Sequence, residues 1–315
     1  MHPKTTLRLG ALVAVAYLTA LAVVDSGRNV FARVADVAGV MPILMIASLG
    51  AYGFRFLRWR MLLASIGHPT PLGRGFLAYI AGFAFTASPG KAGELLRLRY
   101  FGQMGVPHAH GVACFVFERL LDLIVLLMLA GPIAANAPGF GVAMAFVAVV
   151  VAAIVLVAIA ATPRKWLQHR LRTSGYRRSA RWSRVLLLGI SATYQFLPIR
   201  RLVPAVLLGL AAWSIQGLGY AAALTWLGIS LPWPVLWAVP PAATLIGAAS
   251  MIPGGIGTTE AATVLLLTHF GADFDRAVLA AIALRLGSMW FAVLVGFFSM
   301  AYLEHSGGDV AESSR

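Results

Sequence analysis

Six stretches of this chain are apolar over the length that a helix needs to cross a lipid bilayer, which is about 20 residues with a range of about 17–25. They are Leu7–Val24, Gly39–Leu57, Gly111–Ala134, Gly139–Ala161, Val203–Leu227 and Ala277–Tyr302. Hydrophobic side chains make up 60% of the 315 residues and charged ones 11%, whereas soluble globular chains are about 45–50% apolar and about 25% charged. We therefore predict an all-α polytopic membrane protein. A soluble enzyme, a disordered regulator and a nucleic-acid-binding module fit this composition poorly.

Two further apolar stretches are interrupted by proline and glycine. They are 75–101 and 235–270, with break residues Pro89, Gly90, Gly93, Pro253, Gly254, Gly255, Gly257, Thr258 and Thr259. Clusters of this kind break a helix, and broken backbone at membrane depth is tolerated only where protein or a watery cavity covers it. Each segment is therefore either an interrupted span or a re-entrant hairpin that returns to its own side of the membrane.

The basic residues favour the hairpins, because lysine and arginine concentrate in the cytoplasmic loops of membrane proteins. With two hairpins and a cytoplasmic N-terminus, 19 of the 25 basic residues fall inside and three outside. The inner set includes Arg55, Arg58, Arg97 and a block of eight within 164–184. A full crossing by the first broken segment would move that block outside. We predict both termini in the cytoplasm and a location in the inner (plasma) membrane.

The N-terminal segment and the basic segment at 164–184, with the short stretch that follows it, need separate interpretations. Leu7–Val24 also resembles a cleavable signal peptide, so residues 1–22 are either a span or a leader. The block at 164–184 is too charged to span and is predicted to lie on the cytoplasmic surface. Val185–Pro198 is too short to span and is predicted to be an interfacial helix beside anionic lipid.

The two broken segments belong to an internal repeat. Glu94 and Arg119 are 25 residues apart, as are Glu260 and Arg285 (119 − 94 = 285 − 260). Three crossings separate matching points, so the second unit is inverted relative to the first, which is a transporter architecture. The predicted organisation is a first span and outer loop in 1–38, unit A in 39–134, a connecting span and basic segment in 135–202, unit B in 203–302, and a tail in 303–315.

Charged side chains at membrane depth cost roughly 2.5–3.5 kcal/mol each on insertion scales, so they normally face a partner or an aqueous cavity. The candidates for head-group binding or pocket charge are Lys91, Glu94, Arg97, Arg119, Asp122, Glu260 and Arg285. Each break also opens a half-helix, the first over 92–101, whose unpaired N–H groups attract anions. This combination suits a phosphate or another anionic head group.

A structural alternative exists for the same charges. Arg119 could neutralise Glu94 or Asp122, and Arg285 could neutralise Glu260, so that each pair simply locks a hairpin to its neighbouring span. Glu118 is expected only as a partner for a nearby arginine. No metal and no cofactor is predicted, since the single cysteine excludes cysteine-based zinc sites and no phosphate-binding Walker loop is present.

Four motifs together resemble one known family. They are Arg58-Trp59-Arg60-x-Leu62, Ser88-Pro89-Gly90-Lys91-Ala92-Gly93-Glu94-x-x-Arg97, Glu118-Arg119-x-x-Asp122, and Pro253-Gly254-Gly255-Ile256-Gly257-x-x-Glu260 with a downstream Arg285. The chain resembles the lysylphosphatidylglycerol synthase transmembrane-region family over residues 40–302. In its bifunctional members, a flippase-like region that moves aminoacylated phosphatidylglycerol precedes a soluble aminoacyl-transferase domain. That soluble domain is not seen here, so synthesis of the lysyl lipid is not expected.

The resemblance implies a stand-alone, flippase-like protein that handles lipid head groups. The expected partners are membrane lipids (an anionic or aminoacylated phospholipid, or a polyprenyl-linked lipid), with a lipid-modifying enzyme and a second copy of the chain as further candidates. No nucleic-acid partner is expected. The alternative function is a non-transporting scaffold for a lipid- or glycolipid-modifying enzyme. An enzymatic role ranks last, because no nucleophile–base set is visible.

Overall fold

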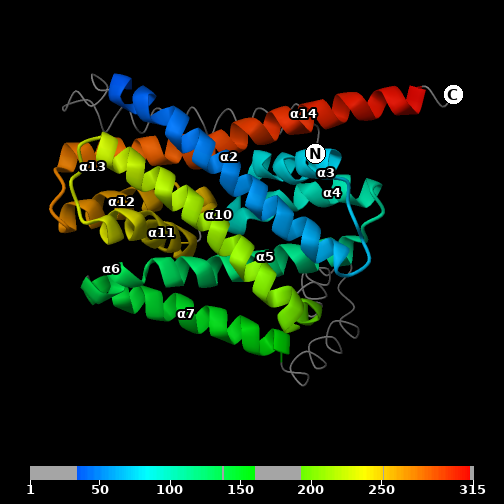
Figure 1. Ribbon diagram of the computed structural model, residues 1–315, viewed down its shortest axis with the longest axis horizontal. Helices are drawn as coiled ribbons and strands as arrows, with labels where there is room; N and C mark the ends of the chain where they lie inside the picture. Colours follow the sequence, from blue (N-terminus) through cyan, green and yellow to red (C-terminus); the bar gives the residue numbers. More distant parts are fainter. Residues whose placement is uncertain (1–33, 137, 160–192, 251, 313–315) are drawn as a thin grey trace.

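The computed structural model describes residues 34–136, 138–159, 193–250 and 252–312, and these residues form helices and connecting turns with no strand among them (Figure 1). Three of the described helical segments are long and apolar enough to cross a membrane. They are Asp36–Ala64, Ile199–Trp226 and Phe274–Ser306. Shorter apolar helices accompany them at Leu72–Phe85, Phe140–Val149 and Trp233–Ala249.

Two long helices, α2 (Val34–Ala64) and α10 (Ile199–Trp226), pack side by side and run antiparallel (Figure 1). Gly219 of α10 lies so close to Ala47 of α2 that a side chain on the glycine would overlap it. Small residues at such contacts let helix backbones approach closely, which compensates for the weak hydrophobic drive between helices in lipid.

The first broken segment is a helical hairpin, here called hairpin A (72–103). Its first arm is α3 (Leu72–Ala81) with η2 (Gly82–Phe85), and its second arm is η3 (Pro89–Leu96) with α4 (Arg97–Gln103). The turn falls immediately before Pro89, which can begin a helix but lacks the N–H that would continue one. The two arms pack against each other.

Helix α5 (His108–Leu129) follows hairpin A, and the short α6 (Gly131–Asn136) leads into α7 (Pro138–Ile159). A 3₁₀ turn, η4 (Thr193–Phe196), precedes α10 and packs against α5.

The second broken segment forms hairpin B (233–269). Helix α11 (Trp233–Ala249) and helix α12 (Thr258–His269) are its arms, and η5 (Pro253–Gly255) lies at its tip. Gly254, Gly255 and Gly257 have φ values of 64°, 62° and 82°. Glycine alone adopts these angles without strain, so the glycine run permits the sharp reversal.

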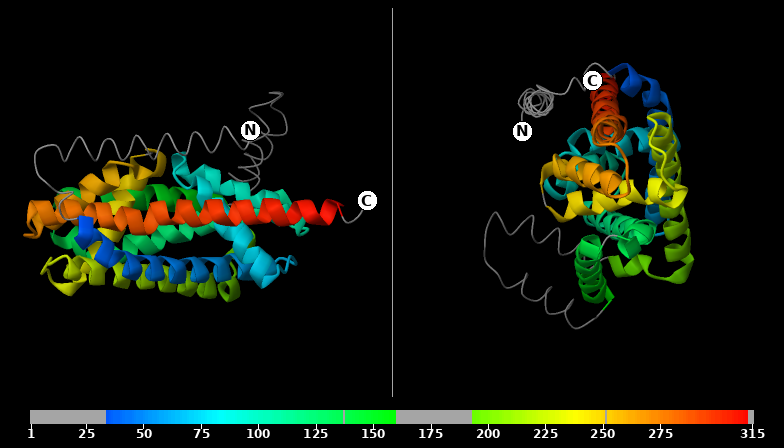
Figure 2. Two further views of the ribbon diagram at one scale, coloured as in Figure 1. Left: turned by 90° about the horizontal axis from the view of Figure 1, so that it is seen from above. Right: turned by 90° about the vertical axis from the view of Figure 1, so that its left-hand side faces the viewer.

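The last described helices form one long element. Helix α13 (Phe274–Arg285) continues through a π-turn, η6 (Leu286–Trp290), into α14 (Phe291–Glu312), and Figure 2 shows this element extending along the length of the molecule.

Each hairpin packs against helices of its own stretch of sequence and also against a helix from the other half of the chain. Hairpin A packs against α14, where a side chain on Gly296 would overlap the backbone of Ala84, and hairpin B packs against α5. The hairpins enter the bundle from opposite ends (Figure 1), and their tips touch where Gly254 meets Ala87. Residues far apart in sequence therefore meet in the middle of the bundle.

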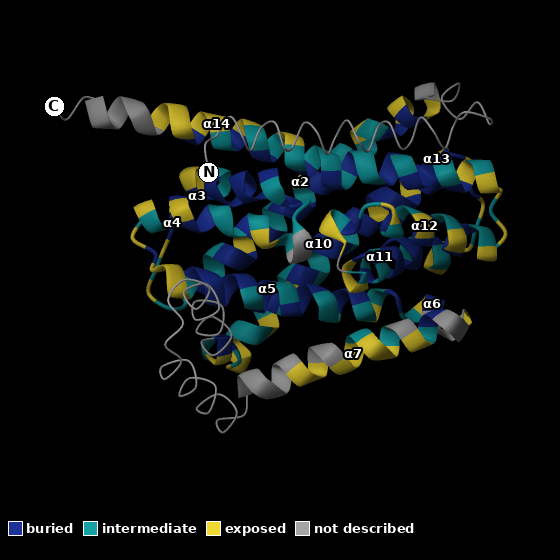
Figure 3. Ribbon diagram, turned by 180° about the vertical axis from the view of Figure 1, so that it is seen from behind, coloured by how far each residue is buried: buried dark blue, intermediate teal, exposed yellow. Residues whose placement is uncertain are grey.

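The outer surface carries large apolar side chains. On α7, Val142, Phe146 and Val149 are 74%, 64% and 67% exposed, and Phe298 of α14 is 69% exposed. Figure 3 shows exposed residues along the outer side of α7, with buried residues concentrated between the helices. Apolar exposure of this extent requires lipid or another apolar partner, in keeping with a multi-pass membrane protein.

Three of the six predicted spans, Gly39–Leu57, Val203–Leu227 and Ala277–Tyr302, fall largely in the described helical segments that are long and apolar enough to cross a membrane. The predicted span Gly111–Ala134 is divided between α5 and α6, and Gly139–Ala161 falls in α7 as far as the described residues reach. The predicted span Gly39–Leu57 is too short, because α2 continues to Ala64. The predicted span Leu7–Val24, the block at 164–184 and most of Val185–Pro198 lie outside the described residues.

Candidate functional site

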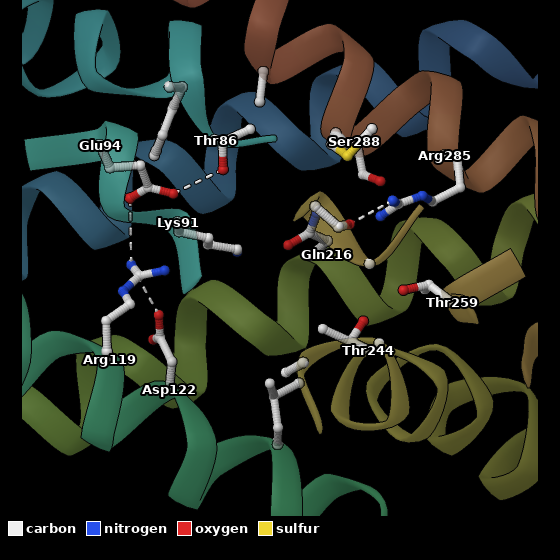
Figure 4. Close-up of a pocket in the computed structure, with 18 of the residues that line it drawn as sticks. Thr86, Lys91, Glu94, Arg119, Asp122, Gln216, Thr244, Thr259, Arg285 and Ser288 are labelled. Atoms are coloured by element: carbon white, nitrogen blue, oxygen red, sulfur yellow. Dashed lines mark hydrogen bonds and ion pairs between the residues drawn. The ribbon is translucent and has the colours of Figure 1, made fainter. Parts of the chain in front are cut away.

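A cavity of about 330 Å³ lies where the hairpin tips meet (Figure 4). Both hairpins contribute to its wall, together with α2, α5, α10 and the residues around the π-turn. Its polar lining consists of Tyr52, Arg55, Thr86, Ser88, Lys91, Glu94, Arg119, Asp122, Gln216, Tyr220, Thr244, Thr259, Arg285 and Ser288. The volume lies at the lower end of the range for small-molecule pockets, about 300–1,000 Å³. It suits a head group rather than a whole lipid.

Glu118 is the centre of a buried ion-pair network beside the cavity. Its carboxylate lies 3.1 Å from Nη2 of Arg58 and 2.9 Å from Nη2 of Arg97, and all three side chains are fully buried. Tyr79 donates a further hydrogen bond to Glu118. The Arg97 guanidinium also packs over the ring of Trp59, 4.2 Å from its centroid. Because buried charges persist only when they are paired and hydrogen-bonded, this network fastens α2, α4 and α5 together.

Arg119 extends this network to the cavity wall. Its Nη2 lies 3.1 Å from Asp122 and 3.9 Å from Glu94. Asp122 also accepts a hydrogen bond from Arg58 at 2.8 Å, and Glu94 accepts one from the Thr86 hydroxyl at 2.8 Å. Arg119 therefore pairs with both of the carboxylates considered in the sequence analysis, closely with Asp122 and at longer range with Glu94.

Arg285 and Glu260 form the corresponding pair at hairpin B. Arg285 Nε lies 2.9 Å from Glu260 Oε1, and Arg285 Nη2 donates a 2.6 Å hydrogen bond to the Gly254 carbonyl. The other carboxylate oxygen of Glu260 accepts from the N–H of Gly257 at 2.9 Å and so caps α12. Arg285 lines the cavity, whereas Glu260 acts behind it.

The π-turn after Arg285 connects this region to α2. Ser48 donates a 2.8 Å hydrogen bond to the Gly287 carbonyl, and Tyr52 donates a 3.1 Å hydrogen bond to the Ser288 carbonyl. A π-turn displaces carbonyls from the regular helical ladder and is common at functional sites. The two hydroxyls of α2 satisfy these carbonyls and so hold the backbone that carries Arg285.

Lys91, at the tip of hairpin A, has the strained backbone of the site. Its φ is 55°, and it is the one non-glycine residue with positive φ in the described ranges. Such a conformation costs about 1–3 kcal/mol and is concentrated at functional sites. Its side chain points into the cavity (Figure 4). Among the described residues its ammonium group has no hydrogen-bond or ion-pair partner.

Arg55 is a second cation without a carboxylate among the residues that the structure describes. It donates a 2.9 Å hydrogen bond to Gln216, and its guanidinium lies 4.5 Å from the ring centroid of Trp213. Gln216 in turn donates to the Tyr220 hydroxyl at 2.8 Å. Arg55 is 8% exposed and lines the cavity, so the neutral contacts orient it without cancelling its charge.

The charges of the described cavity lining and its network sum to an excess of two positive charges. The cations are Arg55, Arg58, Lys91, Arg97, Arg119 and Arg285, and the carboxylates are Glu94, Glu118, Asp122 and Glu260. Six minus four leaves two, and the cations without an acidic partner are Arg55 and Lys91. This arrangement favours an anionic ligand.

Comparison with known proteins identifies the family. Residues 8–296, which are 289 of the 315 (296 − 8 + 1), match the family described as the lysylphosphatidylglycerol synthase TM region. The chain belongs to this family. No curated protein and no solved structure was found to match it. The resemblance inferred from the motifs is confirmed, and with it the membrane class of the protein.

The candidate site residues predicted from the sequence fall into two groups, those that line the cavity and those that do not. Lys91, Glu94, Arg119, Asp122 and Arg285 line the cavity, as do the break residues Gly254, Gly255 and Thr259. Arg97 and Glu260 do not line it. Arg97 pairs with Glu118 behind the cavity wall, and Glu260 pairs with Arg285, which lines the cavity. Glu118, expected only as a partner for an arginine, pairs with three.

The remaining break residues shape the hairpin tips. The predicted half-helix over 92–101 is a 3₁₀ helix in its first part, and α-helix begins only at Arg97. The Ser88 hydroxyl accepts the N–H of Gly93 at 2.6 Å, so this donor is not free to bind an anion. At the other tip, the Thr258 hydroxyl donates to the Gly255 carbonyl at 3.1 Å.

The placement of three arginines in the cytoplasm was wrong. Arg55, Arg58 and Arg97 are 8%, 0% and 0% exposed inside the bundle. Carboxylates from α5, among them Asp122, which is 64 residues from Arg58, offset the cost of burying Arg58. A signal was present in the sequence: Arg55, Arg58 and Leu62 recur at helical spacing and so share one face of a continuous helix.

Proposed function

We propose that this protein is a flippase-like transporter that binds the polar or anionic head group of a membrane lipid in the central cavity and carries it between leaflets. The observation that supports this most strongly is a cavity with two unpaired cations at the meeting point of two oppositely directed hairpins. The acyl chains would stay in the bilayer. Ile252 lines the cavity and is 42% exposed, so the head group would enter past this residue.

The proposed topology has six crossings and two re-entrant hairpins arranged as an inverted repeat. The antiparallel packing of α2 and α10 agrees with inversion. Moving the three buried arginines out of the cytoplasmic set leaves 19 − 3 = 16 basic residues inside and three outside. This asymmetry still favours cytoplasmic termini in the plasma membrane.

The cross-packing of the hairpins supports a mechanism. Because hairpin A lies on α14 and hairpin B lies on α5, rocking one unit against the other would open the cavity first to one leaflet and then to the other. Lys91 and Arg55 would contact the phosphate. Arg119 and Arg285 would hold the two walls, and Glu94 and Asp122 would balance the cations. The driving force would be an ion gradient or downstream consumption of the lipid.

The test is a leaflet-resolved assay with the purified chain in proteoliposomes. Labelled phosphatidylglycerol, aminoacylated phosphatidylglycerol and a polyprenyl phosphate would be offered separately. Transport of at least one is expected, and Lys91→Ala should reduce it strongly. Arg99→Ala is the matched control, because the Arg99 side chain is 60% exposed and does not line the cavity.

If the purified protein moves none of these lipids, and Lys91→Ala and Arg285→Ala leave the cellular phenotype intact, the transport proposal is wrong. Binding without movement would instead indicate a membrane scaffold for a lipid-modifying enzyme, docked through the basic block at 164–184.

A further inference from the structure

We infer that the cavity selects a dianionic phosphate group, either a phosphomonoester or a diphosphate, over a singly charged phosphodiester. This inference rests on the proposed function and narrows its substrate class. It follows from how the charges around the cavity pair with one another.

Most of these charges cancel locally. Arg58, Arg97 and Arg119 face three carboxylates in one connected network. Arg285 pairs with Glu260 at the other hairpin. Neither of these two ion-paired groups contributes a net charge to the cavity. The cavity's preference between ligands of different charge therefore depends on the cations that belong to neither group.

Two such cations remain, one on each of two elements. Lys91 projects from the tip of hairpin A into the cavity. Among the described residues, the Lys91 ammonium group has no hydrogen bond or ion pair, and the Arg55 side chain of α2 has a hydrogen bond to Gln216 and a cation–π contact with Trp213 but no ion pair. A cation enclosed by protein is costly without a counter-charge. Both line the same cavity, so one ligand can reach both.

The number of charges then separates the candidate head groups. A phosphomonoester carries about −1.5 to −2 at pH 7, which nearly cancels the excess of two. A phosphodiester such as phosphatidylglycerol carries one negative charge and leaves one cation uncompensated. Charge-assisted hydrogen bonds from an ammonium and a guanidinium to phosphate oxygens are also stronger than neutral ones.

The same comparison of charges disfavours a lysylated head group. Its two ammonium groups and one phosphodiester sum to one positive charge, which would raise the excess from two to three. This member of the family is therefore better suited to a phosphate-terminated or diphosphate-linked lipid than to the lysyl lipid that gives the family its name.

The experiment compares three probes with the full-length chain in phosphatidylcholine membranes at about pH 7, where the monoester charge is about −1.5 to −2. The probes are phosphatidic acid, phosphatidylglycerol and inorganic diphosphate in solution. Binding is measured by ligand-dependent thermal stabilisation and transport by the leaflet assay. We expect phosphatidic acid to bind at least about tenfold more tightly than phosphatidylglycerol, a difference of about 1.4 kcal/mol.

Variants that remove one charge test directly whether the two unpaired cations cause the preference for phosphatidic acid. Lys91→Gln and Arg55→Gln each remove one unpaired cation, so each should weaken binding of phosphatidic acid more than binding of phosphatidylglycerol and so reduce the preference. A ligand-free denaturation midpoint close to that of the unmodified protein shows that the variants fold. Arg99→Gln removes an exposed arginine away from the cavity and should leave the preference unchanged.

The outcomes separate the two proposals. Equal binding and transport of both lipids, or a preference that survives both variants, would overturn the dianion inference and leave the transport function standing. Failure to bind or move either lipid would overturn the transport function. Tight binding of diphosphate alone would support the dianionic site but contradict a lipid as its ligand.

Discussion

At the scale of single residues, the site depends on carboxylates that hold more than one arginine. Glu118 is fully buried and lies within hydrogen-bonding distance of both Arg58 and Arg97. Removing its charge deprives the buried Arg97 of its closest counter-ion and the buried Arg58 of one of its two counter-ions. Such a residue contributes to the integrity of the site although it does not line the cavity.

The variant Glu118→Gln should lower the stability of the protein by about 3–5 kcal/mol, the usual cost of breaking a buried ion pair. The matched control is Glu304→Gln, whose ion pair with Arg99 is exposed and should be worth about 0–1 kcal/mol. Thermal and chemical denaturation in detergent measure both. Similar losses in the two variants would contradict the importance of the buried network.

Lys91 allows a prediction in which stability and function change in opposite directions. Lys91→Gly should stabilise the protein by about 1 kcal/mol, because glycine accepts the positive φ without strain. The same change should reduce lipid transport, because the ammonium group is lost. Lys91→Ala keeps the strain and should lose transport without gaining stability. Full transport by the glycine variant would show that the ammonium group does not bind substrate.

At the scale of elements, the hairpins are held by close backbone contacts. Gly296→Ala should destabilise the protein, since the added methyl group would overlap the backbone of Phe83 and Ala84 in hairpin A. Gly53→Ala on α2 is the control, because no atom lies within 4 Å of its added methyl. It should stabilise the helix by up to about 1 kcal/mol. Denaturation midpoints of the two variants should move in opposite directions, and a common direction would argue against the packing of hairpin A on α14.

At the scale of the whole molecule, the hairpins open at opposite ends of the bundle, and the proposed topology places these ends on opposite sides of the membrane. Single cysteines at Gln103 and His269, both exposed and each at the open end of one hairpin, test this in a Cys114→Ser background. A membrane-impermeant thiol reagent should label Gln103→Cys only from the cytoplasmic side and His269→Cys only from the outside. Labelling of both from one side would contradict the inverted arrangement.

Several properties could be predicted from sequence because they depend on short stretches of chain. Apolar length predicted the helices, and the clusters around Pro89 and Pro253 predicted the breaks, since proline and glycine act on the local backbone. The 25-residue spacing marked the pairs Glu94–Arg119 and Glu260–Arg285, and both occur as ion pairs. The start of the first half-helix was missed, because the sequence did not indicate the Ser88–Gly93 hydrogen bond or the positive φ of Lys91 at the hairpin turn.

The sequence by itself determined that this chain is helical, belongs in a membrane, is broken at two points and carries more charge at those points than lipid tolerates. Only the tertiary structure decided which charges face the cavity. An arginine near the end of an apolar run is read as the end of a span, because its insertion is costly. Arg55, Arg58 and Arg97 overturn that reading, since carboxylate, amide and aromatic partners from other helices offset the cost inside the bundle. That compensation is non-local, so the two unpaired cations of the cavity become visible only once the helices are packed.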